Sequence, residues 1–188
     1  MARVSDVEID GVPAELRPLY RRFADAYGPF LNQVRIFAHR PPALRHIMGL
    51  VLELADEALV SRRHIEIAVV AVSKLNACEY CVAHHAPRLA AEGLGGETAE
   101  RILDPDCPGL DDLDRLVRDY AVQVTRDARR VPDAMFAALR RHFSEPQIVE
   151  LTLRIALCGF FNRFNDALGI EIEDDAIAGM PAPGDDPR

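Results

Sequence analysis

Two cysteines and a histidine stand close together in the segment NACEYCVAHH, which covers residues 76–85. Cys78 and Cys81 are three residues apart, and His85 follows four residues after Cys81. On a helix, these steps place all three side chains on one face. Two thiols at this spacing can close into a disulfide with little movement of the backbone. The pattern therefore predicts a redox-active dithiol.

The helix that carries this dithiol determines its chemistry. We expect the helix to start near Cys78, where unpaired backbone N–H groups and the positive end of the helix dipole favour a thiolate. His85, one turn after Cys81, is placed to accept the proton of that thiol. Tyr80 and His84 are secondary candidates. We expect Tyr80 to pack in the core or at an interface, and His84 to be a surface residue or a secondary contact.

Glu66 is a further candidate, although it lies outside this segment. It is the acidic residue in the otherwise apolar stretch IEIAVVAV, where the alternative is a carboxylate that faces water at a helix end. If the chain reverses near Asn76 and Ala77, then Glu66 and His85 lie about 16 and 12 Å from the turn, at about 1.5 Å per residue. They can then meet across an antiparallel hairpin. A carboxylate in that place orients the imidazole and raises its basicity.

Two interpretations without redox chemistry stay open for the same residues. Free cysteine buries readily, so the pair can be two small core side chains. Two thiolates and one imidazole are also three of the four ligands that a structural zinc ion requires. The remaining cysteines, Cys107 and Cys158, each stand alone in the sequence and supply no second ligand pair. Haem attachment is excluded, because Val82 and not a histidine follows Cys81.

The composition is that of a globular protein without a nucleic-acid surface. The chain has 188 residues, of which 49% are apolar, enough for one domain with a sizeable core or two small ones that share it. Its 22 basic and 30 acidic residues give a net charge of -8, which argues against a nucleic-acid partner. No apolar run approaches the length of a membrane span, and the N-terminus lacks a signal-peptide pattern. We therefore expect a cytoplasmic protein with reduced thiols and no membrane partner.

The spacing of apolar residues predicts helices throughout, and signals for strands are scarce. The expected helices cover residues 14–27, 30–39, 43–59, 62–76, 78–92, 111–128, 132–143 and 145–168. Ser61 is the expected N-cap of the fourth of these, Pro87 is expected to kink the fifth, and 93–111 is rich in loop residues. Residues 61–89 and 144–168 are weakly similar, which suggests a duplicated helical hairpin whose second copy has no thiols.

We expect a single helical domain over residues 1–178, followed by a disordered tail over 179–188. The first half of the domain, 15–95, carries the Cys-x-x-Cys pair. The second half, 111–175, consists of helices without redox residues. The apolar stripes exceed what one compact bundle needs, so we also expect helices near the N-terminus to be buried between subunits.

The segments RIFAHRPPALRHIM and LVSRRHIEIAVVAVSKLNACEYCVAHH resemble the AhpD-like alkylhydroperoxidase and carboxymuconolactone decarboxylase family. The resemblance covers residues 15–95 well, and FFNRFNDALGIE near the C-terminus is similar to the usual ending of the family. Its specific part is a glutamate twelve residues before a Cys-x-x-Cys, with a histidine four residues after the second cysteine. Every spacing is intact here, in Glu66, Cys78, Cys81 and His85.

The resemblance implies an all-α, multi-helix bundle that assembles into homotrimers or homohexamers and reduces hydroperoxides with thiols. In that pattern, Cys81 attacks the peroxide as the nucleophile. Cys78 resolves the sulfenic acid, which gives a redox-active Cys78–Cys81 disulfide. Glu66 and His85 correspond to proton-relay positions. An external reductant, a dithiol of the thioredoxin or lipoyl type, restores the pair, and no metal or organic cofactor is implied.

The sequence departs from this family pattern in two places. Tyr80 stands where some members have another histidine, which predicts a shorter proton relay with His84 as at most a substitute. Pro87 within the helix is unusual. Two alternatives to the peroxidase stay open. Decarboxylases of the same family act on a lactone acid without redox thiols, so the cysteine pair argues against that activity. The other alternative is a non-enzymatic helical oligomer that senses redox state or binds zinc.

Overall fold

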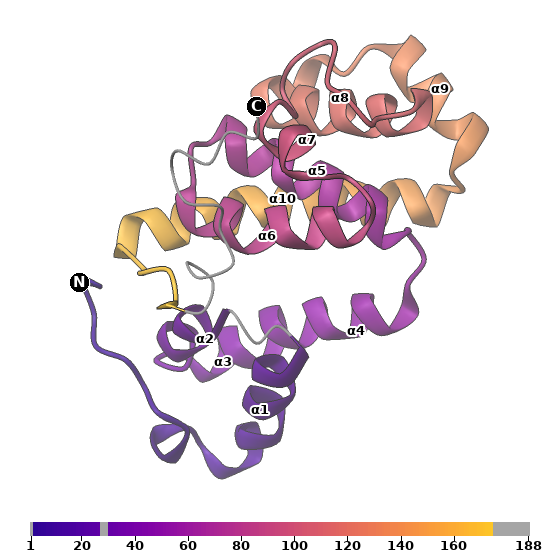
Figure 1. Ribbon diagram of the computed structural model, residues 1–188. Helices are drawn as coiled ribbons and strands as arrows, with labels where there is room; N and C mark the ends of the chain where they lie inside the picture. The colour runs from indigo at the N-terminus through magenta and orange to yellow at the C-terminus, as the bar shows by residue number, and fades with distance from the viewer. Residues whose placement is uncertain (1, 27–29, 175–188) are drawn as a thin grey trace. The chain divides into compact units, whose positions relative to one another are not determined.

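The computed structural model describes residues 2–26 and 30–174, and none of these residues forms a strand. The all-α fold expected from the sequence is thus confirmed (Figure 1). No helix within the described residues combines the length and the apolar composition that a membrane span requires. The tail expected over residues 179–188 lies outside the described residues.

The chain divides into two compact units. One unit comprises the described residues up to Glu57 together with those from Ala167 onward, and the other comprises Ala58–Asp166. All four residues that the sequence singled out for chemistry belong to the second unit. The single domain expected over 1–178 stays a prediction.

The first unit contains α1 (Arg17–Ala26), α2 (Leu31–Phe37), α3 (Pro41–Ala43) and α4 (Gly49–Glu57), with a π-helical turn over Leu44–Met48. The single helix expected over 43–59 is therefore a shorter α-helix preceded by a π-turn and a short helix. That short helix begins at Pro41, where proline suits the first helical position because its missing N–H has no partner there anyway. Leu44, Met48 and Leu52 are buried, as the apolar stripe predicts.

The second unit contains α5 (Arg62–Leu75), α6 (Glu79–Ala91), α7 (Gly96–Glu100), α8 (Asp112–Asp127), α9 (Asp133–His142) and nearly all of α10 (Glu145–Leu168). Apart from α7, these helices match the expected ones to within one residue at each end. The short α7 lies in the stretch 93–111, which was expected to be a loop. The second hairpin suggested for 144–168 is wrong, because that segment is one continuous helix.

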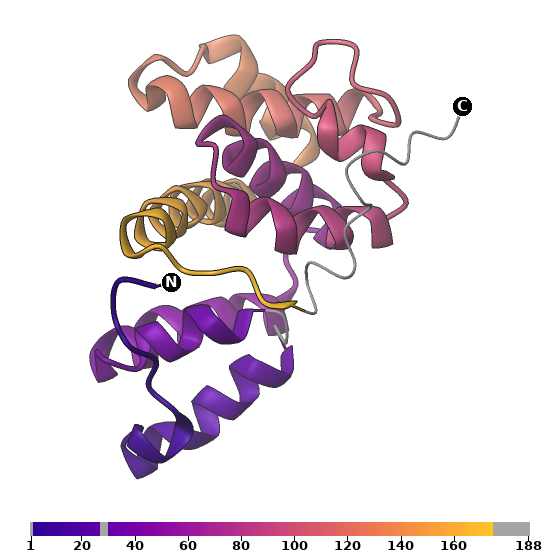
Figure 2. The same ribbon diagram turned by 60° about the vertical axis from the view of Figure 1, so that its left-hand side comes forward.

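Helix α5 is the centre of the second unit. Its residues Ile67–Val72 are all buried, which explains why the run IAVVAV is apolar on every side of the helix. Helices α6 and α8 pack against α5 (Figures 1 and 2). Helix α10 contacts α5 and α6 through side chains, at Ser73 and Cys81. The site residues carried by α5 and α6 are therefore held on a rigid core.

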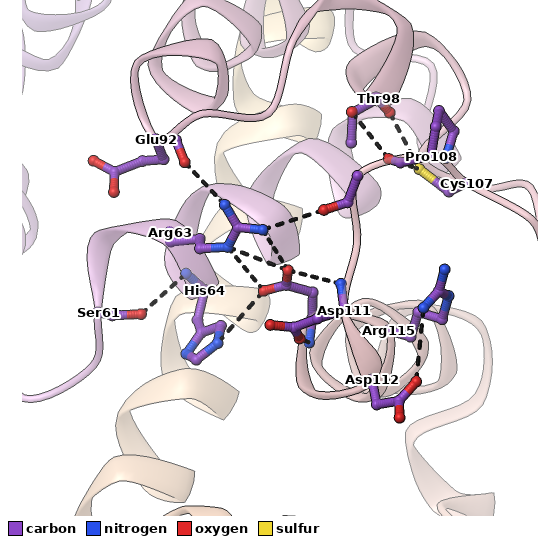
Figure 3. Close-up of polar contacts among 12 residues, drawn as sticks. Ser61, Arg63, His64, Glu92, Thr98, Cys107, Pro108, Asp111, Asp112 and Arg115 are labelled. Carbon is purple, nitrogen blue, oxygen red and sulfur yellow. Dashed lines mark hydrogen bonds and ion pairs between the residues drawn. The ribbon is translucent and has the colours of Figure 1, made fainter.

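An ion pair with a buried carboxylate, that of Asp114, ties the start of α5 to its neighbours. Ser61 caps α5, and its Oγ accepts a hydrogen bond from the N–H of the third helical residue at 3.3 Å, as the sequence predicted. Arg63 donates to Asp114 Oδ2 at 2.6 Å, and the Asp114 side chain is 1% exposed. The guanidinium of Arg63 also donates to the carbonyls of Glu92 and Gly109 at 2.9 and 3.3 Å. One side chain thus fixes α5, the end of α6 and the start of α8 together (Figure 3).

Candidate active site

Helices α5 and α6 form a tight hairpin that brings the site residues together. The chain reverses through Asn76 and Ala77, and Ala77 has a φ of 55°, in the left-handed region that costs a residue with a Cβ about 1–2 kcal/mol. The N–H of Cys78 donates to the carbonyl of Ser73 at 3.0 Å, which closes the turn. Cys78 is the N-cap residue of α6. The reversal occurs where the sequence placed it, so α6 returns along α5.

Glu66 on α5 and His85 on α6 meet across this hairpin. Nδ1 of His85 lies 2.7 Å from Oε2 of Glu66. Glu66 is 3% exposed, so the alternative of a water-facing carboxylate is wrong for this residue. The His85 side chain is 18% exposed. Of the two partners, the imidazole is therefore the one that can exchange protons with solvent.

The charges around Glu66 keep its carboxyl group ionised. Burial alone would raise the pKa of Glu66. The charge and hydrogen bond of His85, helped by Arg88 and Arg62, outweigh burial and hold this pKa below the ordinary 4.5. An ionised carboxylate only accepts hydrogen bonds, so Nδ1 of His85 is the donor in this contact. Nε2 is therefore the ring nitrogen that can take up or release a proton while the contact to Glu66 is kept.

Cys78 and Cys81 are 0% and 3% exposed, and neither is in a disulfide. Their side chains hydrogen-bond to each other, and this contact is the largest cause of a strongly raised pKa at Cys78. Burial and a hydrogen bond to Asp166 on α10 raise that pKa further. The backbone N–H of Cys81 lowers this pKa, as expected at a helix start, but the contributions that raise it are larger. This sulfur holds its proton more tightly than an ordinary thiol.

Helix α10 contributes two side chains that the sequence did not single out for chemistry. Asn165 donates from Nδ2 to Sγ of Cys81 at 3.3 Å. Asn162 accepts at Oδ1 from Nδ2 of Asn76, in the turn before the cysteines, at 2.8 Å. The two asparagines are 1% and 0% exposed. Their spacing of three residues places them on one helix face, but the sequence does not show what that face meets.

The other two cysteines lie in different surroundings. Sγ of Cys158 on α10 is 3.3 Å from Oγ of Ser73, and burial raises the pKa of Cys158 to about 12. Cys107 donates to the carbonyls of Thr98 and Pro108, each at 3.6 Å (Figure 3). Both thiols are buried core side chains. Across residues 2–26 and 30–174, no group of three or more His, Cys, Asp or Glu side chains is placed to hold a metal ion.

The secondary candidates pack against each other on α6. Tyr80 and His84 are 3% and 2% exposed, and their rings meet edge to face with centroids 4.5 Å apart. The core packing expected for Tyr80 is confirmed. The surface position considered for His84 is wrong, because this side of α6 is covered. The helix continues through Pro87 to Ala91.

Comparison with known proteins places this geometry on a known fold. No family model matches the chain. The Bacillus subtilis (strain 168) protein YdfG, which is described as uncharacterized, is 26% identical over 143 residues, covering 73% of this chain and 95% of that protein.

Two groups of solved structures share the fold. The AhpD core of an uncharacterized peroxidase-related protein from Ralstonia eutropha JMP134 matches with a TM-score of 0.77 and 24% identity, covering 93% of this chain and 94% of that chain. The debrominase Bmp8, as a cysteine-to-alanine variant in complex with 2,3,4-tribromopyrrole, matches with a TM-score of 0.76 and 18% identity, covering 95% and 97%. The chain therefore has the AhpD-like all-α fold, as its resemblance to that family implied.

Proposed function

We propose that the protein is a thiol-dependent peroxidase that reduces hydroperoxides with the Cys78–Cys81 dithiol. The observation that carries this proposal is the Glu66–His85 couple, with its 2.7 Å contact, one helical turn from Cys81. A thiol becomes a nucleophile when a neighbouring base takes its proton. A second thiol within hydrogen-bonding reach then permits a two-electron cycle. The AhpD-like fold, shared with peroxidase-related proteins, supports the same function.

The first half-reaction oxidises Cys81. Nε2 of His85 accepts the thiol proton, and the thiolate sulfur attacks the terminal oxygen of the hydroperoxide. The O–O bond breaks as the S–O bond forms, so Cys81 becomes a sulfenic acid. The alkoxide leaves and takes the proton from His85 to become an alcohol. Glu66 holds the imidazole in the required tautomer throughout.

The second half-reaction forms and then reduces the disulfide. The thiol of Cys78 attacks the sulfenic sulfur of Cys81, the S–S bond forms, and the hydroxyl leaves with the proton as water. The raised pKa of Cys78 suits this order, because a thiol that keeps its proton does not compete for the peroxide. An external dithiol of the thioredoxin or lipoyl type then exchanges with the disulfide and is itself oxidised. The cycle suits a reducing compartment such as the cytoplasm, and we expect the protein to act as a homo-oligomer.

The structural match to a debrominase favours a second candidate function, the reductive debromination of a bromoaromatic compound. In the overall reaction, hydrogen replaces bromine on carbon, bromide and a proton leave, and two thiols become a disulfide. Cys78 and Cys81 supply the same two electrons as in the peroxidase cycle. The two candidates therefore differ in substrate and not in the source of reducing power.

Consumption of an organic hydroperoxide in the presence of a dithiol tests the first candidate. We expect turnover by the wild type and by Cys107→Ser, the matched control in a remote core thiol. Cys81→Ser should be inactive. Cys78→Ser should consume about one equivalent of peroxide and then stop, with a sulfenic acid that dimedone traps. Mass spectrometry of the oxidised wild type should find Cys78 linked to Cys81.

Other outcomes separate the alternatives. Bromide release from 2,3,4-tribromopyrrole, the ligand of the matching debrominase, without peroxide turnover would replace the first candidate by the second. Full turnover of either substrate by Cys81→Ser would contradict both. Tightly bound stoichiometric zinc in the purified protein would support the zinc-binding alternative instead.

A further inference from the structure

We propose that Asn165 is a further catalytic residue, which stabilises the thiolate of Cys81 through its side-chain N–H and so helps to select Cys81 over Cys78 as the nucleophile. Nδ2 of Asn165 lies 3.3 Å from Sγ of Cys81, the reacting atom. The inference rests on the proposed dithiol chemistry and assigns a role to a helix that lies far from the cysteines in the sequence.

Burial makes this contact important. Cys81 is 3% exposed and Asn165 is 1% exposed, so water cannot solvate a charge that forms on the sulfur. A buried charge is costly unless hydrogen-bond donors replace the lost water. A thiolate only accepts hydrogen bonds, whereas an asparagine amide carries two N–H donors. The N–H of Asn165 therefore supplies one of the hydrogen-bond donors that a buried thiolate requires.

Two adjacent residues of α10 have opposite effects on the ionisation of the two sulfurs. Asn165 offers a donor to Cys81, whereas Asp166 forms a side-chain hydrogen bond with Cys78. An ionised carboxylate only accepts, so this contact favours the protonated form of Cys78. The Cys78 thiol also hydrogen-bonds to Cys81. Two donors, the amide of Asn165 and the thiol of Cys78, thus face the sulfur of Cys81. At Cys78, the backbone N–H of Cys81 lowers the pKa, but the contacts and burial that raise it are larger.

The position of the Asn165 amide is fixed by contacts along the same helix. One turn earlier, Asn162 holds Asn76 at 2.8 Å, which connects α10 to the turn between α5 and α6. Because this turn immediately precedes Cys78, movement of α10 relative to the cysteines is restrained. The donor is therefore in place before the thiolate forms, as electrostatic stabilisation of a developing charge requires.

Alkylation of Cys81 tests the inference without any substrate. The rate of its reaction with iodoacetamide is measured against pH, and peptide mass spectrometry separates Cys81 from the other cysteines. A hydrogen bond to a charged group is strong enough that its loss should slow labelling at neutral pH about tenfold in Asn165→Ala. Asn165→Asp should slow it further, because it adds a negative charge beside the sulfur. Cys107→Ser, which changes a core thiol that bonds the carbonyls of Thr98 and Pro108 instead, should label Cys81 like the wild type.

A variant of the neighbouring Asp166 keeps the test informative if the Asn165 variants do not fold. Asp166 is exposed, so Asp166→Asn should fold normally, and it should speed the labelling of Cys78 relative to Cys81 severalfold. Wild-type labelling of Cys81 in a folded Asn165→Ala would overturn the inference. If the Asn165 variants do not fold, the test rests on Asp166→Asn. An unchanged ratio of the labelling rates of Cys78 and Cys81 in that variant would overturn the inference. The labelling assay needs no peroxide. If the labelling rates are as expected but the protein does not turn over peroxide, only the proposed function is contradicted.

Discussion

Glu66→Gln keeps the shape of the side chain but removes the charge that faces His85. The interaction that it weakens is a partly buried 2.7 Å hydrogen bond with a charged partner, and such bonds contribute about 1.5–3 kcal/mol. Glutamine retains a weaker hydrogen bond. We therefore expect the free energy of unfolding to fall by about 1–2 kcal/mol. Peroxide turnover should fall about 10- to 100-fold, because the imidazole remains but loses the partner that fixes its tautomer.

The pH dependence of this effect has a definite sign. The pKa of Glu66 in the folded protein lies below the ordinary 4.5. Its contribution to stability is therefore complete above that pH and is lost as the pH falls through the depressed folded value. The difference in stability between wild type and Glu66→Gln should be largest at neutral pH. It should shrink as the pH falls below 4.5.

Urea denaturation, followed by circular dichroism at several pH values, measures this difference. The matched control is Glu79→Gln, the same change in an exposed carboxylate in the first turn of α6. This control should change stability and turnover little, since an exposed charge in a first turn contributes through the helix dipole alone. Equal stability and turnover of the two variants would refute the role assigned to the couple. So would a stability difference that grows as the pH falls.

Three further variants or measurements test the rest of the structure. Arg63→Ala leaves the carboxylate of Asp114, which is 1% exposed, without its main partner, so we expect a loss of about 3–5 kcal/mol in urea denaturation. A loss of less than about 1 kcal/mol in the free energy of unfolding would be typical of a surface ion pair and would contradict this expectation. Ser61→Ala removes the N-cap of α5 and should lower the free energy of unfolding by about 1 kcal/mol in the same assay. An unchanged free energy would show that the cap does not form in solution. Because burial raises the pKa of Cys158 to about 12, iodoacetamide at neutral pH should label it only in the unfolded protein. Rapid labelling of native Cys158 would show that its side chain is accessible.

The sequence predicted the hairpin site because the relevant signals are local. Apolar periodicity and a serine cap defined α5, and the polar residues at Asn76 marked the reversal. Once two helices are antiparallel with a tight turn, residues at similar distances from the turn must come close. This is why Glu66 and His85, nineteen positions apart, could be predicted to form a pair from the sequence. The spacing showed that the contact was possible, since a rise of about 1.5 Å per residue places both residues within a few ångströms of the same height along the hairpin.

The part played by α10 could not be found in this way. Asn165 follows Cys81 by 84 positions, and no rule of spacing connects two helices over such a separation. A mixture of Asn, Arg and Asp at the end of a helix is as typical of a solvated face as of a buried one. The same ambiguity affected His84, whose burial depends on which helices cover that side of α6. Local pattern determines which residues share a face, whereas the packing of distant helices decides what that face meets.

The state of Cys78 shows how packing can reverse a local expectation. Its place at the start of α6 favours a thiolate through the helix dipole, an effect of about 0.3–1 kcal/mol. Against this stand complete burial and hydrogen bonds to Cys81 and Asp166, which favour the thiol. A single hydrogen bond to a charged group contributes about 1.5–3 kcal/mol, so these effects exceed the dipole. The sulfur nearer the helix start therefore has a raised pKa, and the proposed mechanism assigns the charge to the sulfur one turn later, beside Asn165.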